Sequence, residues 1–178
     1  MTIDDKDMIN SILESVSRID YIKPEDIPNI DLYMDQVTTF MEEQLVSSKR
    51  YADDKILTKT MINNYSKEKL LNPIKGKKYS HQHIMQMLCV YQLKQTLALG
   101  DVKQLTGRGD VDFEACWKQF LDDKQRLRDF IPAQLSENMA ADLDDPAQRL
   151  SLCLALSAIA SYMRRMCEAI IDETAADA

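Results

Sequence analysis

Apolar residues recur along most of this chain at a spacing of three to four positions, the pattern of an α-helix with one buried face. Strict alternation of apolar and polar residues, which would indicate strands, is not a feature of any long segment. The pattern predicts an all-α protein, with helices at about 6–20, 29–46, 59–69, 80–97, 112–130 and 146–172 and a short helix carrying Val102 and Leu105.

Capping residues and prolines set the expected ends of these helices. Thr58 and Ser80 are predicted N-caps, and Asp145 followed by Pro146 is a strong start signal for the last helix. The helix at 59–69 should stop before Asn72-Pro73, because a residue that precedes proline is pushed out of helical geometry. The segment Thr106-Gly-Arg-Gly109 and the pair Ile131-Pro132 are expected to end the two helices before them.

Three regions are predicted from these boundaries. Residues 1–28 form an N-terminal helix and linker, and residues 29–107 form a central helical region. Residues 108–178 form a C-terminal helical hairpin that would serve dimerisation or effector binding. The helix at 80–97 should lie at the centre of its region, because apolar residues occupy most of its circumference.

The longest apolar stretch without a charge covers 14 residues, Leu150 to Met163. It is too short and too rich in serine and alanine for a bilayer span, which needs about 20 residues, so a buried helix is the better interpretation. The acidic N-terminus has no apolar run behind it and does not read as a signal peptide. We therefore expect a cytoplasmic location, and the cysteine spacing agrees, because Cys89, Cys116, Cys153 and Cys167 form no zinc or disulfide pattern and are expected to act as small apolar residues.

The predicted helix at 59–69 has a polar face of unusual composition. Thr60, Asn63, Asn64 and Lys67 recur at i, i+3, i+4 and i+7, whereas Glu and Lys dominate an ordinary solvated helix face. Asparagine can pair with adenine through two hydrogen bonds, so this face could read base edges in DNA. The alternative is a solvated surface with no role in binding, because Asn is common near helix ends.

The formal net charge is −7, which by itself argues against a nucleic-acid partner. The charge is unevenly distributed, however. Residues 1–54 hold 5 basic and 13 acidic residues, residues 55–103 hold 9 and 2, and residues 104–178 hold 8 and 14, giving −8, +7 and −6. All nine basic residues of the central block are lysines, which favours point-charge contacts with phosphate. The lysines expected near DNA are Lys59, Lys67, Lys75, Lys77 and Lys78.

These residues carry a family resemblance. The run Leu57-Thr-Lys-Thr-Met-Ile-Asn-Asn-Tyr65, then Leu70-Leu-Asn-Pro73, a Lys/Gly turn, Tyr79-Ser80 and Val102-Lys-Gln-Leu105 resembles the winged helix-turn-helix of MerR-type regulators. The run from Tyr21 to Leu105 resembles, more closely, a bacterial domain-of-unknown-function family, number 1836, which is itself MerR-like. The resemblance implies a DNA-binding transcriptional regulator whose helix at 59–69 enters the major groove, with Lys75, Lys77 and Lys78 on the phosphate backbone.

The chain also departs from the MerR pattern. MerR relatives usually carry arginines at the positions of Thr60 and Asn63 and a Tyr-Tyr pair at Asn64-Tyr65. A protein-interaction module with a winged-helix fold and no sequence-specific DNA reading is therefore the alternative, in which the lysines meet an acidic partner.

The remaining segments give no indication of a catalytic or metal site. His81 and His83 stand two apart at a helix start, where a surface or capping role is expected in place of a metal site. No nucleophile–base pair or phosphate loop is present, so the expectation is a protein without enzymatic activity, cofactor or metal. Trp117 and Phe120 are expected in the core.

In the last helix, small residues would let another helix approach closely: Ser151, Ala155, Ser157, Ala158 and Ser161. Core packing and a homodimer interface both suit that stripe. The expected partners are double-stranded DNA and a second copy of the chain, with no membrane. The sequence names neither an effector nor a target site.

Overall fold

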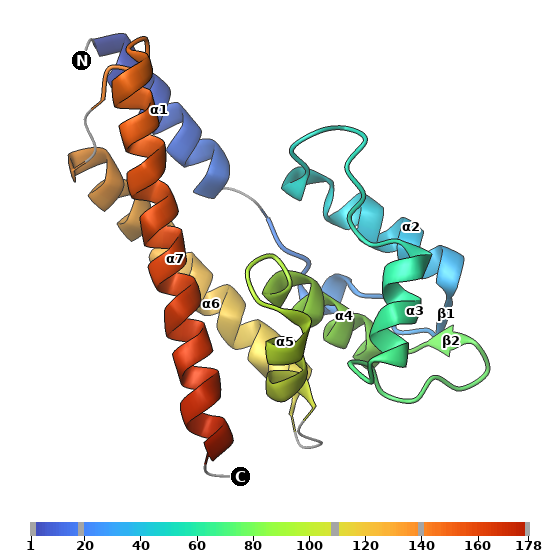
Figure 1. The fold of residues 1–178 in the computed structure, drawn as a ribbon. Helices are drawn as coiled ribbons and strands as arrows, with labels where there is room; N and C mark the ends of the chain where they lie inside the picture. Colours follow the sequence, from blue (N-terminus) through green and yellow to red (C-terminus); the bar gives the residue numbers. More distant parts are fainter. Residues whose placement is uncertain (1–2, 18–19, 108–110, 139–140, 177–178) are drawn as a thin grey trace. The chain divides into compact units, whose positions relative to one another are not determined.

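The computed structural model describes residues 3–17, 20–107, 111–138 and 141–176. Across these residues the regular structure is mostly helical, with seven α-helices and one small antiparallel ribbon (Figure 1). The helices are α1 (Ile3–Ser17), α2 (Met34–Gln44), α3 (Lys59–Lys67), α4 (His81–Leu93), α5 (Leu99–Thr106), α6 (Phe113–Asn138) and α7 (Pro146–Ala176). The ribbon pairs β1 (Leu32–Tyr33) with β2 (Lys78–Tyr79), and short 3₁₀ turns lie at Pro24–Asp26 and Val46–Ser48.

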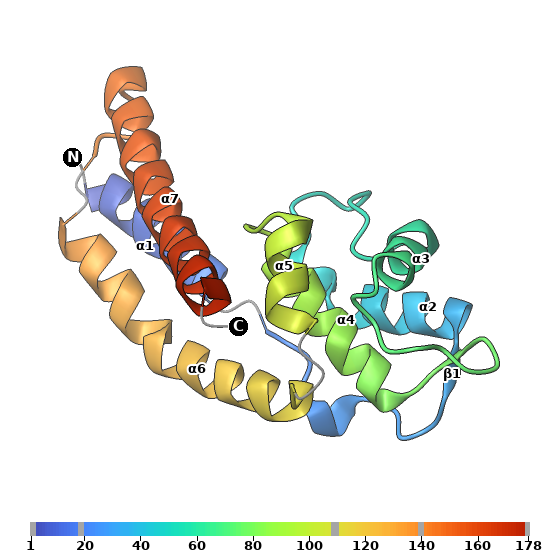
Figure 2. The same ribbon diagram turned by 60° about the horizontal axis from the view of Figure 1, so that its bottom comes forward.

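The chain divides into two compact units. The first contains Met1–Ile19 and Asp122–Ile170, and the second contains Asp20–Leu121 and Ile171–Ala178. The predicted N-terminal region at 1–28 is thus shared, because α1 groups with the C-terminal helices and the residues from 20 onwards belong to the second unit. Figure 2 shows α6 as one continuous helix that contributes to both units.

Helix α4 lies at the centre of the second unit, as the sequence predicts. Seven of its thirteen residues are buried, including Ile84, Met87 and Leu88. Apolar side chains from α2, α3, α5 and the start of α6 complete the same core, among them Met41, Ile62, Val102 and Trp117. The indole N–H of Trp117 donates to the carbonyl of Ile22 over 2.8 Å, so this tryptophan packs in the core with its polar atom satisfied, and Phe120 packs beside it.

The predicted helix at 29–46 is wrong at its N-terminus, because α2 begins at Met34. Leu32 and Tyr33 are extended and pair with Tyr79 and Lys78, and Leu32 is buried. The backbone N–H of Tyr33 then bonds to the side-chain oxygen of Gln36 over 2.9 Å, which closes the first turn of the helix. The two pairs join residues 47 and 45 positions apart, so no local pattern predicts the pairing.

Two buried polar side chains of α4 hold the connection between α3 and β2. The side-chain oxygen of Gln86 accepts from the backbone N–H of Asn72 over 2.9 Å, and His83 Nε2 lies 3.2 Å from the Asn72 carbonyl. His83 Nδ1 in turn accepts from the backbone N–H of Ser80 over 3.1 Å, forming the capping box of α4. The expected capping roles of Ser80 and His83 are confirmed, and the backbone at Asn72 is fixed at both of its polar groups.

The first unit consists of α1, the later part of α6 and most of α7. Asp145 caps α7 as predicted, accepting from the backbone N–H of Ala147 over 2.8 Å. Asp5 of α1 is buried, and its carboxylate accepts from the backbone N–H of Leu143 over 3.4 Å. This contact ties the start of α1 to the loop before α7.

Three expectations for the C-terminal helices are wrong. Helix α6 continues through Pro132 to Asn138, because favourable helix formers on both sides outweigh the one hydrogen bond that proline forfeits. Helix α7 contains the apolar stretch at 150–163 but does not bury it, since Leu150, Leu154 and Tyr162 are largely exposed. Three of the four cysteines, Cys116, Cys153 and Cys167, are likewise exposed and not packed as core residues.

The other predicted boundaries lie within a few residues of the observed ones. Helix α1 starts and ends earlier than 6–20, and residues 18–19 lie outside the described residues. Helix α4 ends at Leu93, four residues before its predicted end, and α5 ends at Thr106. The predicted stop at 106–109 extends into residues 108–110, which also lie outside the described part of the chain.

Candidate nucleic-acid interface

Helix α3 is short, and local signals fix where it begins and ends. Thr58 is its N-cap, and the Thr58 hydroxyl accepts from the backbone N–H of Met61 over 3.2 Å. Ile62 and Tyr65 face the core and are 0% and 2% exposed, and burial raises the pKa of the Tyr65 phenol. One side of α3 is therefore anchored against the second unit, and the orientation of its other side is set.

The polar face of α3 is open to solvent. Thr60, Asn63, Asn64 and Lys67 are all exposed, opposite the buried side chains of the same helix. None of these four side chains takes part in an internal hydrogen bond or ion pair that the structure records among its described residues. The structure brings together the residues that the i, i+3, i+4, i+7 spacing predicts.

Helix α3 ends in a Schellman motif that the sequence does not reveal. The N–H of Leu70 bonds to the carbonyl of Tyr65 over 2.9 Å and the N–H of Lys69 to that of Ser66 over 3.1 Å. Lys69 adopts a φ of +60°, a conformation that usually selects glycine. The helix therefore stops at Lys67 because of this motif, two residues before its predicted end at about 69. The motif also leaves Lys69 exposed, as an additional lysine next to the polar face.

The lysine-rich turn is a tight β-hairpin. Gly76 and Lys77 have φ values of +62° and +60°, two consecutive positive values that are typical of a type I′ turn. The N–H of Lys78 bonds to the carbonyl of Lys75 over 3.2 Å and closes the turn. Because β2 also pairs with β1, the hairpin is joined to the start of α2. Figures 1 and 2 both show it projecting from the edge of the second unit.

The predicted lysines fall into two groups. Lys67, Lys75 and Lys77 are exposed, and no carboxylate of the described residues pairs with them. Lys59 forms an ion pair with Asp35 of α2, and the ammonium of Lys78 lies 5.1 Å from the centre of the Tyr33 ring. Lys59 and Lys78 are therefore engaged within the chain. Sequence reasoning missed both contacts, because their partners lie more than twenty residues away.

Acidic groups lie beside this basic surface. Asp35 and Glu43 are exposed on α2, the helix that packs against α3. The carboxylate of Glu68, at the end of α3, lies 3.9 Å from the ammonium of Lys103 on α5. Around α3 and the hairpin, the uncompensated lysines are thus those at the exposed end of α3 and in the hairpin, fewer than the lysine count of residues 55–103 suggests.

The described residues offer little for other kinds of site. No group of three or more His, Cys, Asp or Glu side chains among them is placed to hold a metal ion. The four cysteines are free, and burial raises the pKa of Cys89 to about 12, so that its thiol is a poor nucleophile. Within the described part of the chain, no helix has both the length and the apolarity that a membrane crossing requires.

The second unit contains the whole of a segment that matches a known sequence family. No curated protein matches the chain, and no solved structure does. Residues 22–113, just over half of the chain, match a family described as a domain of unknown function, DUF1836. The match begins at the core residue Ile22, includes α2 to α5 with the hairpin, and ends at the first residue of α6. The chain therefore belongs to the DUF1836 family.

Proposed function

We propose that this protein is a DNA-binding transcriptional regulator in which α2, α3 and the hairpin act as a MerR-like winged helix-turn-helix. The observation that carries the proposal is the exposed polar face of α3, Thr60, Asn63, Asn64 and Lys67, next to a hairpin with uncompensated lysines. In this assignment α3 is the recognition helix and the β-hairpin is the wing. The activity requires no catalytic step, cofactor or metal.

The order of elements supports the assignment. Helix α2 is followed by α3, and the hairpin strand β2 then pairs with the residues that precede α2. Helix α3 has nine residues, and at 1.5 Å per residue it is about 13 Å long, short enough to lie across a major groove about 12 Å wide. Gln86 and His83 hold Asn72 and so keep the hairpin at a defined place relative to α4.

The chemistry of the face suggests how DNA would be read. Asn63 and Asn64 can each donate and accept, which suits adenine in the major groove. Thr60 can contact a thymine methyl group or a phosphate, whereas Lys67 would act as a point charge. Lys75 and Lys77 would contact the phosphate backbone from the wing. To contact phosphates, Lys59 would have to break its ion pair with Asp35, and Lys78 would have to leave the ring of Tyr33.

Salt dependence tests the phosphate contacts. Neutralising about 5 phosphates predicts a log–log slope of the binding constant against salt of about −4 to −5. Lys75→Gln and Lys77→Gln should each reduce that slope by about 1. Lys94→Gln is the matched control, because Lys94 is an exposed lysine at the far end of α4. Weak binding that ignores salt, or an equal effect of Lys94→Gln, would reject the wing contacts.

Base reading is tested by selection of genomic DNA with the purified protein. A shared sequence should be enriched by the wild type and lost or relaxed after Asn63→Ala and Asn64→Ala, with each mismatched contact costing about 1–3 kcal/mol. Gln104→Ala, an exposed amide on α5, is the control and should leave the enriched sequence unchanged. Enrichment that survives both asparagine substitutions would show that this face does not read bases.

A protein-interaction module is the second candidate, and the carboxylates of α2 favour it. Asp35 and Glu43 would repel a phosphate backbone that approaches α3 from that side. The MerR arginines are also absent, so an acidic protein segment could occupy the lysines of α3 and the hairpin. Affinity capture distinguishes the two: an acidic protein retained through Lys67, Lys75 and Lys77, with no enrichment of DNA, would support the interaction module.

A further inference from the structure

A cavity of about 520 Å³ lies within the second unit, between the start of α4 and the start of α6. Amide, imidazole and carboxylate side chains line it, among them His81, Gln86, Asp112 and Glu114. All of the lining residues belong to the second unit. The volume is in the range of small-molecule sites, about 300–1,000 Å³, so the polar groups of the lining can be compared with what a ligand would offer them.

Gln86 is the most buried polar side chain of this lining, with 3% of its surface exposed. Its oxygen accepts from the backbone N–H of Asn72, which leaves the amide nitrogen with two N–H donors. This nitrogen has no hydrogen-bond partner among the described residues. It is also not sealed in the core, because the Tyr65 hydroxyl is the one side-chain polar group of the described residues that is fully buried without a partner. The Gln86 N–H groups are therefore open to the cavity and can donate to a ligand.

His81 and Glu114 supply a pair of hydrogen-bond acceptors. His81 Nε2 lies 3.3 Å from the carbonyl of Pro24, which can only accept, so Nε2 carries the hydrogen and Nδ1 of the neutral ring is an acceptor. This Nδ1 lies 3.9 Å from Glu114 Oε2. One ammonium nitrogen can donate to two atoms at that separation, with about 2.8 Å to each. The pair is therefore spaced to share a cationic nitrogen.

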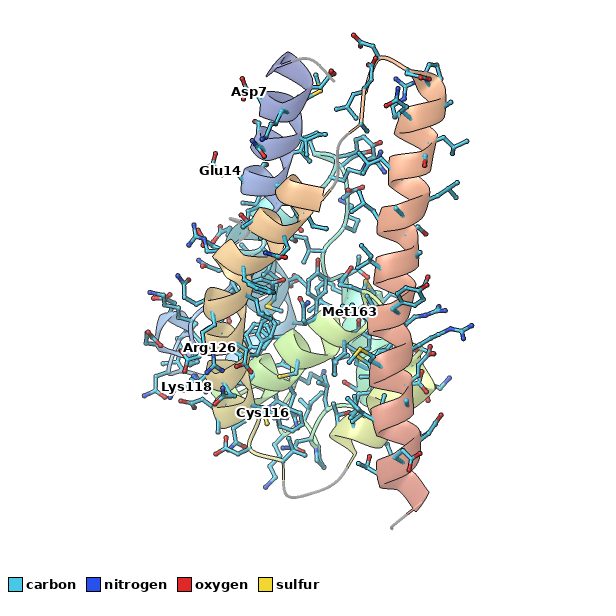
Figure 3. All side chains as sticks on the ribbon, turned by 90° about the vertical axis from the view of Figure 1, so that its left-hand side faces the viewer. Asp7, Glu14, Cys116, Lys118, Arg126 and Met163 are labelled. Atoms are coloured by element: carbon cyan, nitrogen blue, oxygen red, sulfur yellow. The ribbon has the colours of Figure 1, made fainter. Side chains whose placement is uncertain are left out.

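The charge of the lining also favours a cation. Glu114 accepts from the ammonium of Lys118 over 2.6 Å, one turn further along α6, and this contact lowers the pKa of Glu114 and compensates its charge (Figure 3 labels Lys118). Asp112 accepts from the backbone N–H of Ala115 over 3.0 Å, and no cation of the described residues forms an ion pair with its carboxylate. The charge of Asp112 is thus left uncompensated, which favours a positively charged ligand and disfavours a phosphate or carboxylate.

We propose that this cavity binds a small α-amino amide. The ammonium group of the ligand donates to His81 Nδ1 and Glu114 Oε2, with Asp112 as its counter-charge. The carbonyl oxygen of the ligand accepts from the Gln86 amide. An apolar side chain on the ligand suits the rest of the wall, which is formed by Met85, Val111 and Phe113. Single amino-acid amides and the amino end of a peptide both present this chemistry, and the inference does not depend on DNA binding.

Isothermal titration calorimetry on the full chain tests the proposal, with leucinamide as the probe. N-acetylleucinamide keeps the carbonyl group and the side chain but has no charge, so it should bind at least about 10-fold more weakly. No binding of leucinamide at millimolar concentration, or equal affinities for the two amides, would overturn the proposal. The tripeptide leucyl-glycyl-glycine distinguishes the two sources: tighter binding than leucinamide indicates the amino end of a peptide, and weaker binding indicates a free amino amide.

Asp112→Asn tests the cationic end of the site. Asparagine can still cap α6, so the change removes the charge and keeps the helix start. The affinity for leucinamide should fall about 3- to 5-fold at low salt, and that for N-acetylleucinamide should not change. Asp145→Asn is the matched control, because it makes the same change at the N-cap of α7 in the first unit. Equal losses of affinity in the two variants would reveal unspecific attraction by the acidic chain and would reject the site.

Gln86→Met tests the buried donor. Both amides offer a carbonyl oxygen, so the affinity for leucinamide and that for N-acetylleucinamide should each fall about 3- to 10-fold. Gln92→Met is the matched control, because Gln92 is a half-buried glutamine of the same helix that does not line the cavity, and it should bind both amides as the wild type does. Circular dichroism at the titration temperature verifies that both variants are folded. Wild-type affinity in folded Gln86→Met would show that the amide does not contact the ligand and would overturn the proposed site.

Discussion

The hydrogen bond between Gln86 and Asn72 joins a core side chain to the connection that leads into the hairpin. We therefore expect its loss to lower the stability of the second unit. Gln86 is 3% exposed, and its oxygen is the acceptor for the Asn72 backbone N–H at 2.9 Å. Gln86→Met keeps the length of the side chain but removes this acceptor. Because Asn72 is itself exposed, its N–H can bond to water in the variant, and the cost is that of losing one hydrogen bond, about 0.5–1.5 kcal/mol. The free energy of unfolding should fall by that amount.

Urea denaturation followed by tryptophan fluorescence measures this change. Trp117 is the only tryptophan of the chain and lies in the core of the same unit, so its emission reports the unfolding of that unit. With a slope of about 2 kcal/mol per molar urea, the midpoint should fall by roughly 0.5 M. Gln82→Met is the control, because Gln82 is exposed on the same helix and should change stability by less than about 0.5 kcal/mol. Equal midpoints for Gln86→Met and Gln82→Met would refute the role of this bond.

Three further predictions concern single residues. Lys69→Gly should stabilise the protein by up to about 1 kcal/mol, because glycine adopts the observed φ of +60° without a steric penalty; a lower urea midpoint would contradict this. Pro132→Ala should raise the melting temperature of the first unit, followed by circular dichroism, since it restores an interior helical hydrogen bond whose loss costs up to about 3 kcal/mol. Burial raises the pKa of Cys89 from 9.0 to about 12, so the stability contributed by its neutral thiol is complete below pH 9 and is lost as the pH rises towards 12. Cys89→Ala should therefore flatten the fall of the urea midpoint between pH 9 and pH 11, and an unchanged fall would show that other groups cause it.

Local signals in the sequence are sufficient to locate the helices and three of their N-caps. Thr58, Ser80 and Asp145 each act as a cap within a few residues of their own position, so the hydrogen bonds they make can be read from the adjacent sequence. The ribbon is different, because Leu32 lies in a strand only through its pairing with Tyr79, 47 residues further along the chain. An apolar residue at position 32 fits a helix and a strand equally well until that partner is known.

In the candidate interface, too, some features follow from the local sequence and others depend on tertiary contacts. The polar face of α3 follows from the helical period, so the spacing of Thr60, Asn63, Asn64 and Lys67 in the sequence is enough to group them. The pairing of Lys59 with Asp35 and the position of Lys78 over Tyr33 depend on tertiary contacts, which no local pattern encodes. The apolar stretch of α7 is a further case, since helical periodicity identifies an apolar face and does not say whether that face is buried.

The charge of the candidate interface sets how many phosphates it can reach. Internal contacts engage Lys59 and Lys78, leaving Lys67, Lys75 and Lys77 as the uncompensated lysines of the predicted interface, with Lys69 exposed beside them. These four lysines would neutralise about 4 phosphates and give a slope of about −4, whereas a slope near −5 requires that Lys59 also leaves Asp35. Lys69→Gln should therefore reduce the slope by about 1, as Lys75→Gln and Lys77→Gln do, and Lys94→Gln should leave it unchanged. A slope that Lys69→Gln does not change would show that the C-terminal end of α3 makes no phosphate contact through this lysine.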